Sequence, residues 1–439
     1  MRHFFGSASS TSPTKDKVDA GPDVDELEED GKVVSTQGII LMYPEYHPRD
    51  HYPGMDLTRV TLPTFVLEPK SMLERITNFM CHPDLLLHIP SIDDPVARFV
   101  EVIRFYMSGW YLRPKGAKKP LNPVLGEHFS CKWIFHDGSA AFYLSEQVSH
   151  HPPISAYFYM APKQGIRIDG CLVPKSRFLG NSAATIMEGK AYMSFNQYPG
   201  ELYAISQPNV YARGILFGRM RLEFGDSVMV ECEKTDLIAN IEFKTKGFIS
   251  GTYDAISGKI QRKSTGDVLF ELSGKWSDQL YIKDTQNGGE RELLFDTTTA
   301  VASPPIVRLE EEQEERESRR LWKAVTSAII ARDQVTATDA KGAIEDRQRE
   351  ESRTREAEGI DWEPRFFVRQ DNNDYTLRHK IISTDPKAVS KEIENIIGIS
   401  SHSQLHRFHP CKNKHGKTSS SDLSVCMMDD GVGKMSLHS

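Results

Sequence analysis

The chain has 439 residues, and 54 Lys or Arg against 61 Asp or Glu give a formal net charge of −7. This acidic balance, with near-average Gly and Pro contents, argues against collagen-like, wholly disordered and nucleic-acid-coating proteins. Because 39% of the residues are hydrophobic, the chain can bury a sizeable core, but no stretch approaches the roughly 18 consecutive apolar residues of a membrane span.

Both ends of the chain are polar. Residues from about 1 to 36, within an arm that we place at 1–54, are rich in Ser, Thr and Pro and then in Asp and Glu, and residues 400–439 are rich in Ser, His, Lys and Gly. Such segments bury too little surface to offset the entropy lost on ordering, so we expect a disordered N-terminal arm, one domain at 55–399 and a disordered tail. No apolar signal segment follows Met1, which predicts a cytoplasmic protein.

The N-terminal part of the domain carries strand and helix patterns. The run RVTLPTFVL, residues 59–67, predicts a strand or an extended lid, and Ser71 precedes an apolar-periodic segment that predicts a helix. A second helix is predicted from Pro95 to Tyr111, where apolar side chains recur at three- and four-residue spacing.

Residues from Phe129 to Trp276 form many short apolar or alternating runs separated by Gly, Pro, Asn and Asp. This rhythm predicts an antiparallel meander, folded as a sandwich or closed as a barrel. We favour a wide barrel, because closure removes unpaired strand edges and leaves room for a ligand. The chain then becomes helical from Glu310 onward, and the segment near residues 337–359 has almost no apolar face.

The first segment that suggests chemistry is KKPLNPVLGEHF, residues 118–129. Pro120 and Pro123 fix an irregular turn, which presents Lys119 and Asn122 rather than burying them in a strand ladder.

The second segment is SEQVSHHPPISA, residues 145–156. Two prolines follow His150 and His151 and restrict the backbone before them, so both ring edges can converge on one anion at a strand end.

A metal site is disfavoured because no further ligands lie at a suitable spacing, and so is a disulfide framework, because the six cysteines are widely separated. Hydrolysis is disfavoured because GFISG, residues 247–251, has its Ser in the wrong place. Two ordinary turn histidines remain an alternative.

A third group lies on the polar C-terminal helix. Lys341, Glu345 and Arg349 are spaced i, i+4 and i+8 and therefore share one face. A solvated salt-bridge ladder is the ordinary interpretation. A phosphate clamp is the alternative, with Glu345 holding the two cations in position.

EQVSHHPPISA and KKPLNPVLGE together resemble the signatures of the oxysterol-binding-protein-related lipid transfer family, and the resemblance extends over about residues 55 to 367. It implies an α+β, mainly antiparallel β fold: a wide incomplete β-barrel enclosing a lipid tunnel, with an N-terminal lid and helices and a C-terminal helical region. It also implies a lipid carrier without a cofactor or an enzymatic reaction.

The resemblance further implies the site residues. The phosphatidylinositol 4-phosphate headgroup would be held by Lys119, Asn122, His150, His151, Lys341, Glu345 and Arg349. The segments around residues 55–76 and 174–191 look most like the branch that exchanges phosphatidylserine for this phosphoinositide. In that branch the lid and the serine headgroup would involve Val60, Leu62, Lys119, Asn122 and Ser176.

The expected protein is thus a monomeric, cytoplasmic carrier that touches membranes transiently, at contacts between the endoplasmic reticulum and the plasma membrane, and binds no nucleic acid. Two alternatives remain open. The same tunnel could carry a sterol in place of phosphatidylserine, or the protein could sense the phosphoinositide as a scaffold without moving lipid.

Overall fold

The computed structural model describes residues 66–113, 118–179, 181–214, 220–247, 251–370 and 374–399, and the backbone of three short strands outside them. Two of these strands, β1 (Glu28–Glu29) and β2 (Lys32–Val33), pair within the predicted arm. The rest of the arm, Val60 and Leu62 of the predicted lid, and most of the predicted tail lie outside the described residues.

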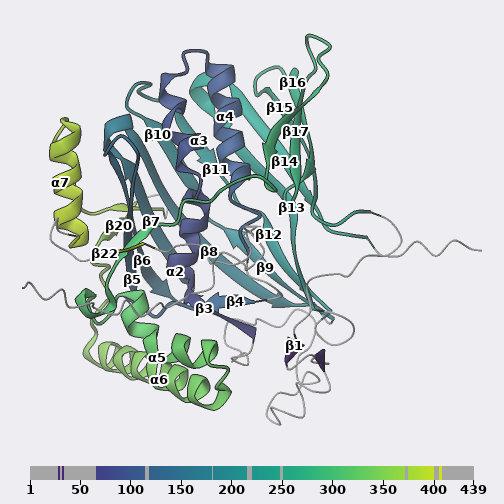
Figure 1. Cartoon of the computed structure of the whole chain (residues 1–439). Coiled ribbons are helices and arrows are strands. Elements are labelled where there is room, and N and C mark those ends of the chain that lie inside the picture. Colours follow the sequence, from purple (N-terminus) through teal and green to yellow (C-terminus); the bar gives the residue numbers. More distant parts are fainter. Residues whose placement is uncertain are drawn as a thin grey trace, which may run out of the picture.

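One antiparallel sheet of 16 strands dominates the fold (Figure 1). Its strands are, in chain order, β5 (His128–Ile134), β6 (Ala140–His150), β7 (Pro153–Ala161), β8 (Ile166–Phe178), β9 (Ser182–Glu188), β10 (Ala191–Phe195), β11 (Leu202–Ile205), β12 (Asn209–Arg213), β13 (Arg221–Cys232), β14 (Leu237–Lys244), β15 (Ala255–Arg262), β16 (Val268–Lys275), β17 (Gln279–Asp284), β18 (Arg291–Asp296), β19 (Ile306–Arg308) and β22 (Leu405–Arg407).

The sheet curves into a ring that hydrogen bonds do not close. Its main path is β18-β17-β16-β15-β14-β13-β11-β10-β8-β7-β6-β5-β19-β22, and β9 and β12 bridge β8 and β13 beside it. Within the described residues, β18 and β22 are the two ends of this path and do not pair. The incomplete barrel predicted from the sequence is therefore confirmed. The predicted tail, however, contributes β22 to the sheet, where it pairs with β19.

Short helices precede the large sheet. They are α2 (Met72–Arg75), η4 (Ile76–Met80), α3 (Pro83–Leu87), η5 (Ile89–Ser91) and α4 (Pro95–Ser108). Helix α4 follows the prediction closely: Asp94 accepts the amide N–H of Ala97 at 2.6 Å as its N-cap. It ends before Tyr111 at Gly109, where an added Cβ would lie 2.9 Å from the Cα of Phe79.

The segment around Ser71 differs from the prediction in two ways. A strand, β3 (Leu67–Ser71), continues beyond the run predicted at 59–67 as far as Ser71, and it pairs in parallel with β4 (Lys119–Leu121). The helix after Ser71 is a single α-turn that continues as the 3-10 helix η4. Apolar spacing alone does not separate these two helix types, because both bring residues three apart onto one side.

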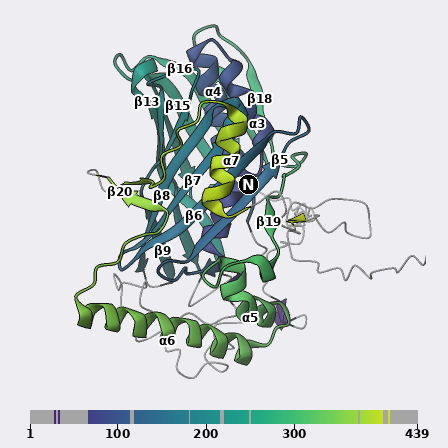
Figure 2. The same cartoon turned by 90° about the vertical axis from the view of Figure 1, so that its left-hand side faces the viewer.

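The two faces of the sheet bury different partners, because successive side chains of a strand point to opposite faces. Tyr143 and Tyr157 belong to the inner cluster that includes α2, α3 and α4, whereas Phe142 and Phe158 belong to an outer cluster with α7 (Pro386–Ile397). Figure 2 shows α7 lying over the outside of β5 to β8. This double burial explains why β6 and β7 read as nearly continuous apolar runs.

Two helices, α5 (Ser318–Ile330) and α6 (Gln334–Glu358), lie across one end of the ring (Figure 1). Helical structure was expected from Glu310 onward, but only one 3-10 turn, η8 (Glu310–Glu312), forms before α5 begins at Ser318. The solvated character expected of this acidic stretch holds for Glu311, Glu312, Glu314 and Glu315, which are exposed. Glu317 is buried there because its carboxylate accepts from Arg308.

The C-terminal part adds the hairpin β20 (Phe367–Arg369) and β21 (Tyr375–Leu377) beside β7 and β8. No helix in the described part of the chain is both long and apolar enough to cross a bilayer.

Candidate functional site

The two sequence motifs lie side by side in the fold. The amide of Gln147 on β6 donates to the carbonyl of Glu127 at 2.8 Å, and the amide of Gly126 donates to the carbonyl of Gln147 at 3.0 Å. Strand β6 then ends at His150, which pairs with Pro153 at the start of β7. This end of the sheet is called the mouth below.

The His150 and His151 rings meet edge to face at the mouth, with centroids 4.6 Å apart. His151 is exposed, whereas His150 is half-buried and its Nδ1 has no hydrogen-bond partner. Burial lowers the pKa of His150 to about 4, the charge of His151 acts in the same direction, and a hydrogen bond with the Pro123 backbone opposes them. At neutral pH the His150 ring without a ligand is therefore uncharged. Its one N–H meets the Pro123 carbonyl, and Nδ1 can donate to a phosphate only when the ring is protonated, which the charge of the phosphate favours.

Lys119, on β4, has an electrostatic neighbour in common with His150, namely Glu345. The Lys119 side chain is exposed, and yet desolvation by the surrounding protein lowers the pKa of its ammonium, which is the behaviour expected of a side chain in a recess. The nearby charge of Lys341 lowers this pKa further, and Glu345 raises it. The fold therefore brings Lys119 near Lys341 and Glu345, which follow it by more than 200 positions in the sequence.

The α6 triad is only partly assembled. The Lys341 ammonium donates to Glu345 at 2.6 Å, with 12% of the Lys341 side chain exposed. Arg349 instead pairs with Asp346, three residues away, and 54% of its side chain is exposed. Glu345 thus positions Lys341 and not both cations, which differs from the arrangement expected from the helical spacing.

In the described part of the structure, no side-chain hydrogen bond or ion pair joins Asn122 or Ser176 to this cluster. Asn122 is exposed in the loop after β4. Ser176 lies on β8 and its hydroxyl shares a hydrogen bond of 3.1 Å with Thr185 of β9. Ser155, near the start of β7, pairs with Leu172 of β8. Strand β8 therefore extends beyond the start of β7 on the side of the mouth, and Ser176 lies in this extension.

Comparison with known proteins decides the family. A profile described as oxysterol-binding protein matches residues 49–387. The chain belongs to the oxysterol-binding protein family. The resemblance predicted from the two motifs is therefore confirmed.

Individual relatives cover most of this family member. Oxysterol-binding protein homolog 7 of Saccharomyces cerevisiae is 50% identical over 354 residues, which is 79% of this chain and 80% of that protein. Human oxysterol-binding protein-related protein 5 is 44% identical over 323 residues, 72% of this chain but 36% of that longer protein. The solved Osh3 ORD domain of Saccharomyces cerevisiae in complex with PI(4)P has the same fold, with a TM-score of 0.59 at 21% identity, covering 83% of this chain and 95% of that one.

Two buried carboxylates, those of Glu127 and Glu146, hold the two motifs in place in this family member. Neither residue was singled out from the sequence. Glu127 is fully buried, and burial raises its pKa. It accepts hydrogen bonds from four groups on three segments: the hydroxyls of Ser71 and Ser318, the indole N–H of Trp322 at 2.8 Å, and the amide of Val124 at 3.1 Å. Glu127 thereby ties β3 and α5 to the loop before β5.

Glu146 has the matching role in the second motif. Its two carboxylate oxygens accept the amide N–H groups of Arg365 and Phe366, each at 2.8 Å, and burial raises its pKa. A charged residue inside an apolar strand was the available sequence signal, because a buried carboxylate requires such donors.

Helix α6 is fixed over the first motif by polar contacts. The amide of Leu125 donates to Gln348 at 2.7 Å, and Arg316 donates to the carbonyl of Leu125 at 2.7 Å while it pairs with Glu351. These contacts hold the C-terminal half of α6 in place.

The expectation that this helix has almost no apolar face is wrong for its N-terminal half, where Ala337 is buried and Ala340 and Ile344 pack against a cluster that includes Trp322 and Val325 of α5.

Histidine burial also makes the stability of the protein pH-dependent. The pKa values of His82, His128 and His150 are lowered to about 4, mainly by desolvation. The unfolded chain takes up these protons as the pH falls below about 6.5, whereas the folded chain takes them up only near pH 4. The free energy of unfolding should therefore decrease as the pH falls through this window. The decrease is at most about 1.4 kcal/mol per pH unit for each histidine. Urea unfolding from pH 7.5 to 4.5 measures this slope.

The control for this prediction is a matched pair of variants. His82→Gln should flatten the slope, because it removes one buried titrating ring, whereas His136→Gln replaces an exposed ring and should not. Equal slopes in the wild type and His82→Gln would contradict the assignment.

Proposed function

We propose that this family member is a non-vesicular lipid transfer protein that exchanges phosphatidylserine for phosphatidylinositol 4-phosphate between membranes. The observation that carries the proposal is the grouping of Lys119, Lys341 and His150 at one end of an apolar ring. A cationic rim suits a phosphorylated headgroup, and an apolar interior suits acyl chains. The Osh3 domain with bound PI(4)P has this fold, which supports the same class of ligand here.

The physical need for such a carrier follows from the acyl chains. Each CH₂ group moved from lipid into water costs about 0.8 kcal/mol, so a lipid crosses the cytosol at a useful rate only inside an apolar enclosure. The headgroup stays at the rim, where charge-assisted hydrogen bonds to Lys119, Lys341 and the histidines provide specificity.

The two lipids share part of the site in this proposal. Lys119 and Asn122 contact either headgroup, the histidines and the α6 residues Lys341, Glu345 and Arg349 contact the phosphoinositide, and Ser176 contacts the serine headgroup. Val60 and Leu62 belong to the lid. Because one lipid excludes the other, a phosphoinositide gradient can drive the serine lipid in the opposite direction.

The domain organisation belongs to the same proposal. The lipid-binding domain spans residues 55–399, and the flanking segments are an arm and a tail. The protein acts as a monomer that changes no covalent bond, and it works in the cytoplasm at contacts between the endoplasmic reticulum and the plasma membrane.

The test is competition among lipids. The purified protein is offered liposomes that contain phosphatidylserine, a sterol and phosphatidylinositol 4-phosphate, and native mass spectrometry identifies what it extracts. We expect phosphatidylserine, displaced by the phosphoinositide, and transport of both lipids between liposomes. Extraction of sterol instead would assign the chain to sterol exchange, and phosphoinositide binding without transfer would favour a scaffold.

A further inference from the structure

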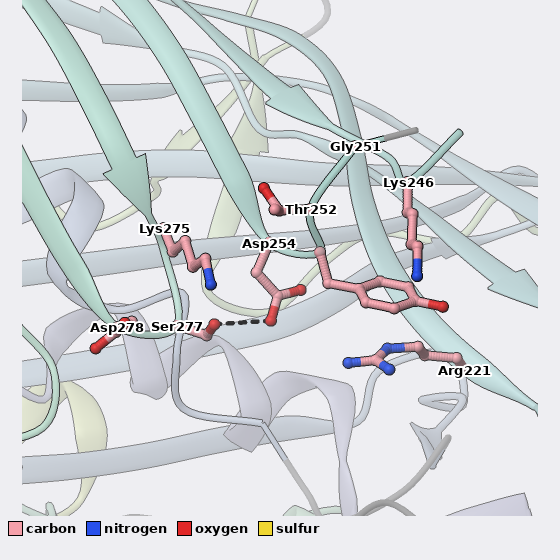
Figure 3. Close-up of a pocket in the computed structure, with 9 residues that line it drawn as sticks. Arg221, Lys246, Gly251, Thr252, Asp254, Lys275, Ser277 and Asp278 are labelled. Atoms are coloured by element: carbon pink, nitrogen blue, oxygen red, sulfur yellow. Dashed lines mark hydrogen bonds between the residues drawn. The ribbon is translucent and has the colours of Figure 1, made fainter. Parts of the chain in front are cut away.

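A charged cavity lies on the rim of the ring, and none of the proposed headgroup residues lines it. Its volume is about 480 Å³, within the usual range for small-molecule sites, and its walls include Arg221, Lys246, Tyr253, Asp254 and Lys275 (Figure 3).

The strand register places this cavity at the mouth end of the sheet. Arg221 begins β13 and pairs with Arg213 at the end of β12, which pairs in turn with Ser182 at the start of β9. Strand β9 follows the end of β8, where Ser176 lies. Because the strands alternate in direction, the ends of β14 and β16 that line the cavity share this side.

Three cations line the cavity: Arg221 at the start of β13, Lys246 just after β14 and Lys275 at the end of β16, with Asp278 as a second carboxylate besides Asp254. Two of them pack on the ring of Tyr253: the Arg221 guanidinium carbon is 3.6 Å and the Lys246 ammonium 4.3 Å from its centroid. Lys275 lies across the cavity at the end of β16. In the described part of the chain, neither Lys246 nor Lys275 has an ion-pair partner. An anion placed among them would relieve the mutual repulsion of these charges.

Asp254 adds a second requirement. It is 7% exposed; one carboxylate oxygen, Oδ2, accepts from the Ser277 hydroxyl at 2.7 Å and lies 3.5 Å from the Arg113 guanidinium. The other oxygen, Oδ1, is buried and has no partner. A buried acceptor without a donor is costly, so a ligand that supplies an O–H or N–H here gains affinity.

The donor should be uncharged. An ammonium group at Oδ1 would lie near Arg113, Arg221, Lys246 and Lys275, and the Arg113 charge already compensates the Asp254 carboxylate. A hydroxyl group meets no such repulsion. The cavity therefore suits an anionic group and a neighbouring hydroxyl in one molecule.

We propose that this cavity binds a phosphorylated polyol with the chemistry of an inositol phosphate. The phosphate lies between Lys246 and Lys275, and a ring hydroxyl donates to Asp254 Oδ1. The polyol can be a free inositol phosphate or the headgroup of an inositol lipid in the membrane that the mouth faces.

The test measures protection of lysines from acetylation in the wild-type protein, read by peptide mass spectrometry. The probes are inositol 1,4-bisphosphate, with O-phosphoserine as its soluble control, and phosphatidylcholine vesicles with phosphatidylinositol 4-phosphate, with vesicles of equal charge that contain phosphatidylserine as their control. Lys246 and Lys275 should be protected at least threefold, and Lys259, exposed on β15 outside the cavity, should not. Protection by the soluble probe identifies a free ligand. Protection only by the phosphoinositide vesicles identifies the lipid headgroup.

Variants separate this cavity from the headgroup site. In the His150→Ala, His151→Ala background, Lys246→Ala with Lys275→Ala should weaken binding of the protecting probe at least tenfold, whereas Lys259→Ala should not. The proposal is overturned by the absence of lysine protection, by equal protection from the phosphatidylserine vesicles or from O-phosphoserine, or by equal weakening in Lys259→Ala. Failure of lipid exchange would leave these readouts intact, so the two proposals can fail separately.

Discussion

Replacing His150 and His151 together with alanine is expected to reduce extraction of phosphatidylinositol 4-phosphate at least about a hundredfold, because a bound phosphate favours the protonated imidazoles and their charge-assisted hydrogen bonds are lost. His151 is exposed and His150 half-buried with a spare Nδ1, so the loss of stability should be small by comparison. Fluorescent phosphoinositide extraction from liposomes, together with a thermal melt, measures both effects.

The same variant should retain most phosphatidylserine extraction, because the proposed serine contacts are Lys119, Asn122 and Ser176. The matched control is His136→Ala, which removes an exposed histidine in the turn before β6, at the far end of that strand from His150. Unchanged phosphoinositide extraction in the double variant would remove the histidines from the site. An equal loss of both lipids would indicate general damage to the mouth.

Glu127→Ala should lower the free energy of unfolding by roughly 3 kcal/mol or more, because four buried donors lose their acceptor and each unsatisfied group costs about 1–3 kcal/mol. The measurement is urea denaturation at neutral pH.

Glu127→Gln should cost less than the alanine variant. The hydroxyls of Ser71 and Ser318 share Oε1, and either hydroxyl can rotate to accept from an amide NH₂ placed there. The matched control is Glu242→Ala on β14, whose carboxylate is 56% exposed. If Glu127→Ala changed stability no more than Glu242→Ala, the carboxylate would not hold β3 and α5 in place.

Local pattern was sufficient to predict several elements. Pro95 and the three- and four-residue apolar spacing located α4, and the alternation of short runs located the antiparallel ring. The i, i+4 spacing also gave the Lys341 to Glu345 ion pair, because that contact lies within one helix.

Contacts that join distant segments were not predictable in this way. The side-chain donors to Glu127 lie 56, 191 and 195 residues away, so no window of sequence contains them. Arg349 was assigned to the triad by helical periodicity, but Asp346 is a nearer competitor for it. Helix α7 was not predicted, although its signals are local: Asp385 and Pro386 begin it, and Val389, Ile393 and Ile397 recur at four-residue spacing. Only the surface that this apolar face covers, the outer side of β6 and β7, depends on distant segments.

The gap between β18 and β22 has a mechanical consequence for the protein. In a closed barrel, the strand number and stagger fix the diameter, and widening it breaks ladder hydrogen bonds. Here no ladder joins β18 to β22 in the described part of the chain, so strand pairing does not by itself fix the girth of the ring. What holds the two ends in place is packing on the inner helices and the hydrogen bond from the Ser303 amide to the Cys81 carbonyl, so the girth depends on how these helices pack.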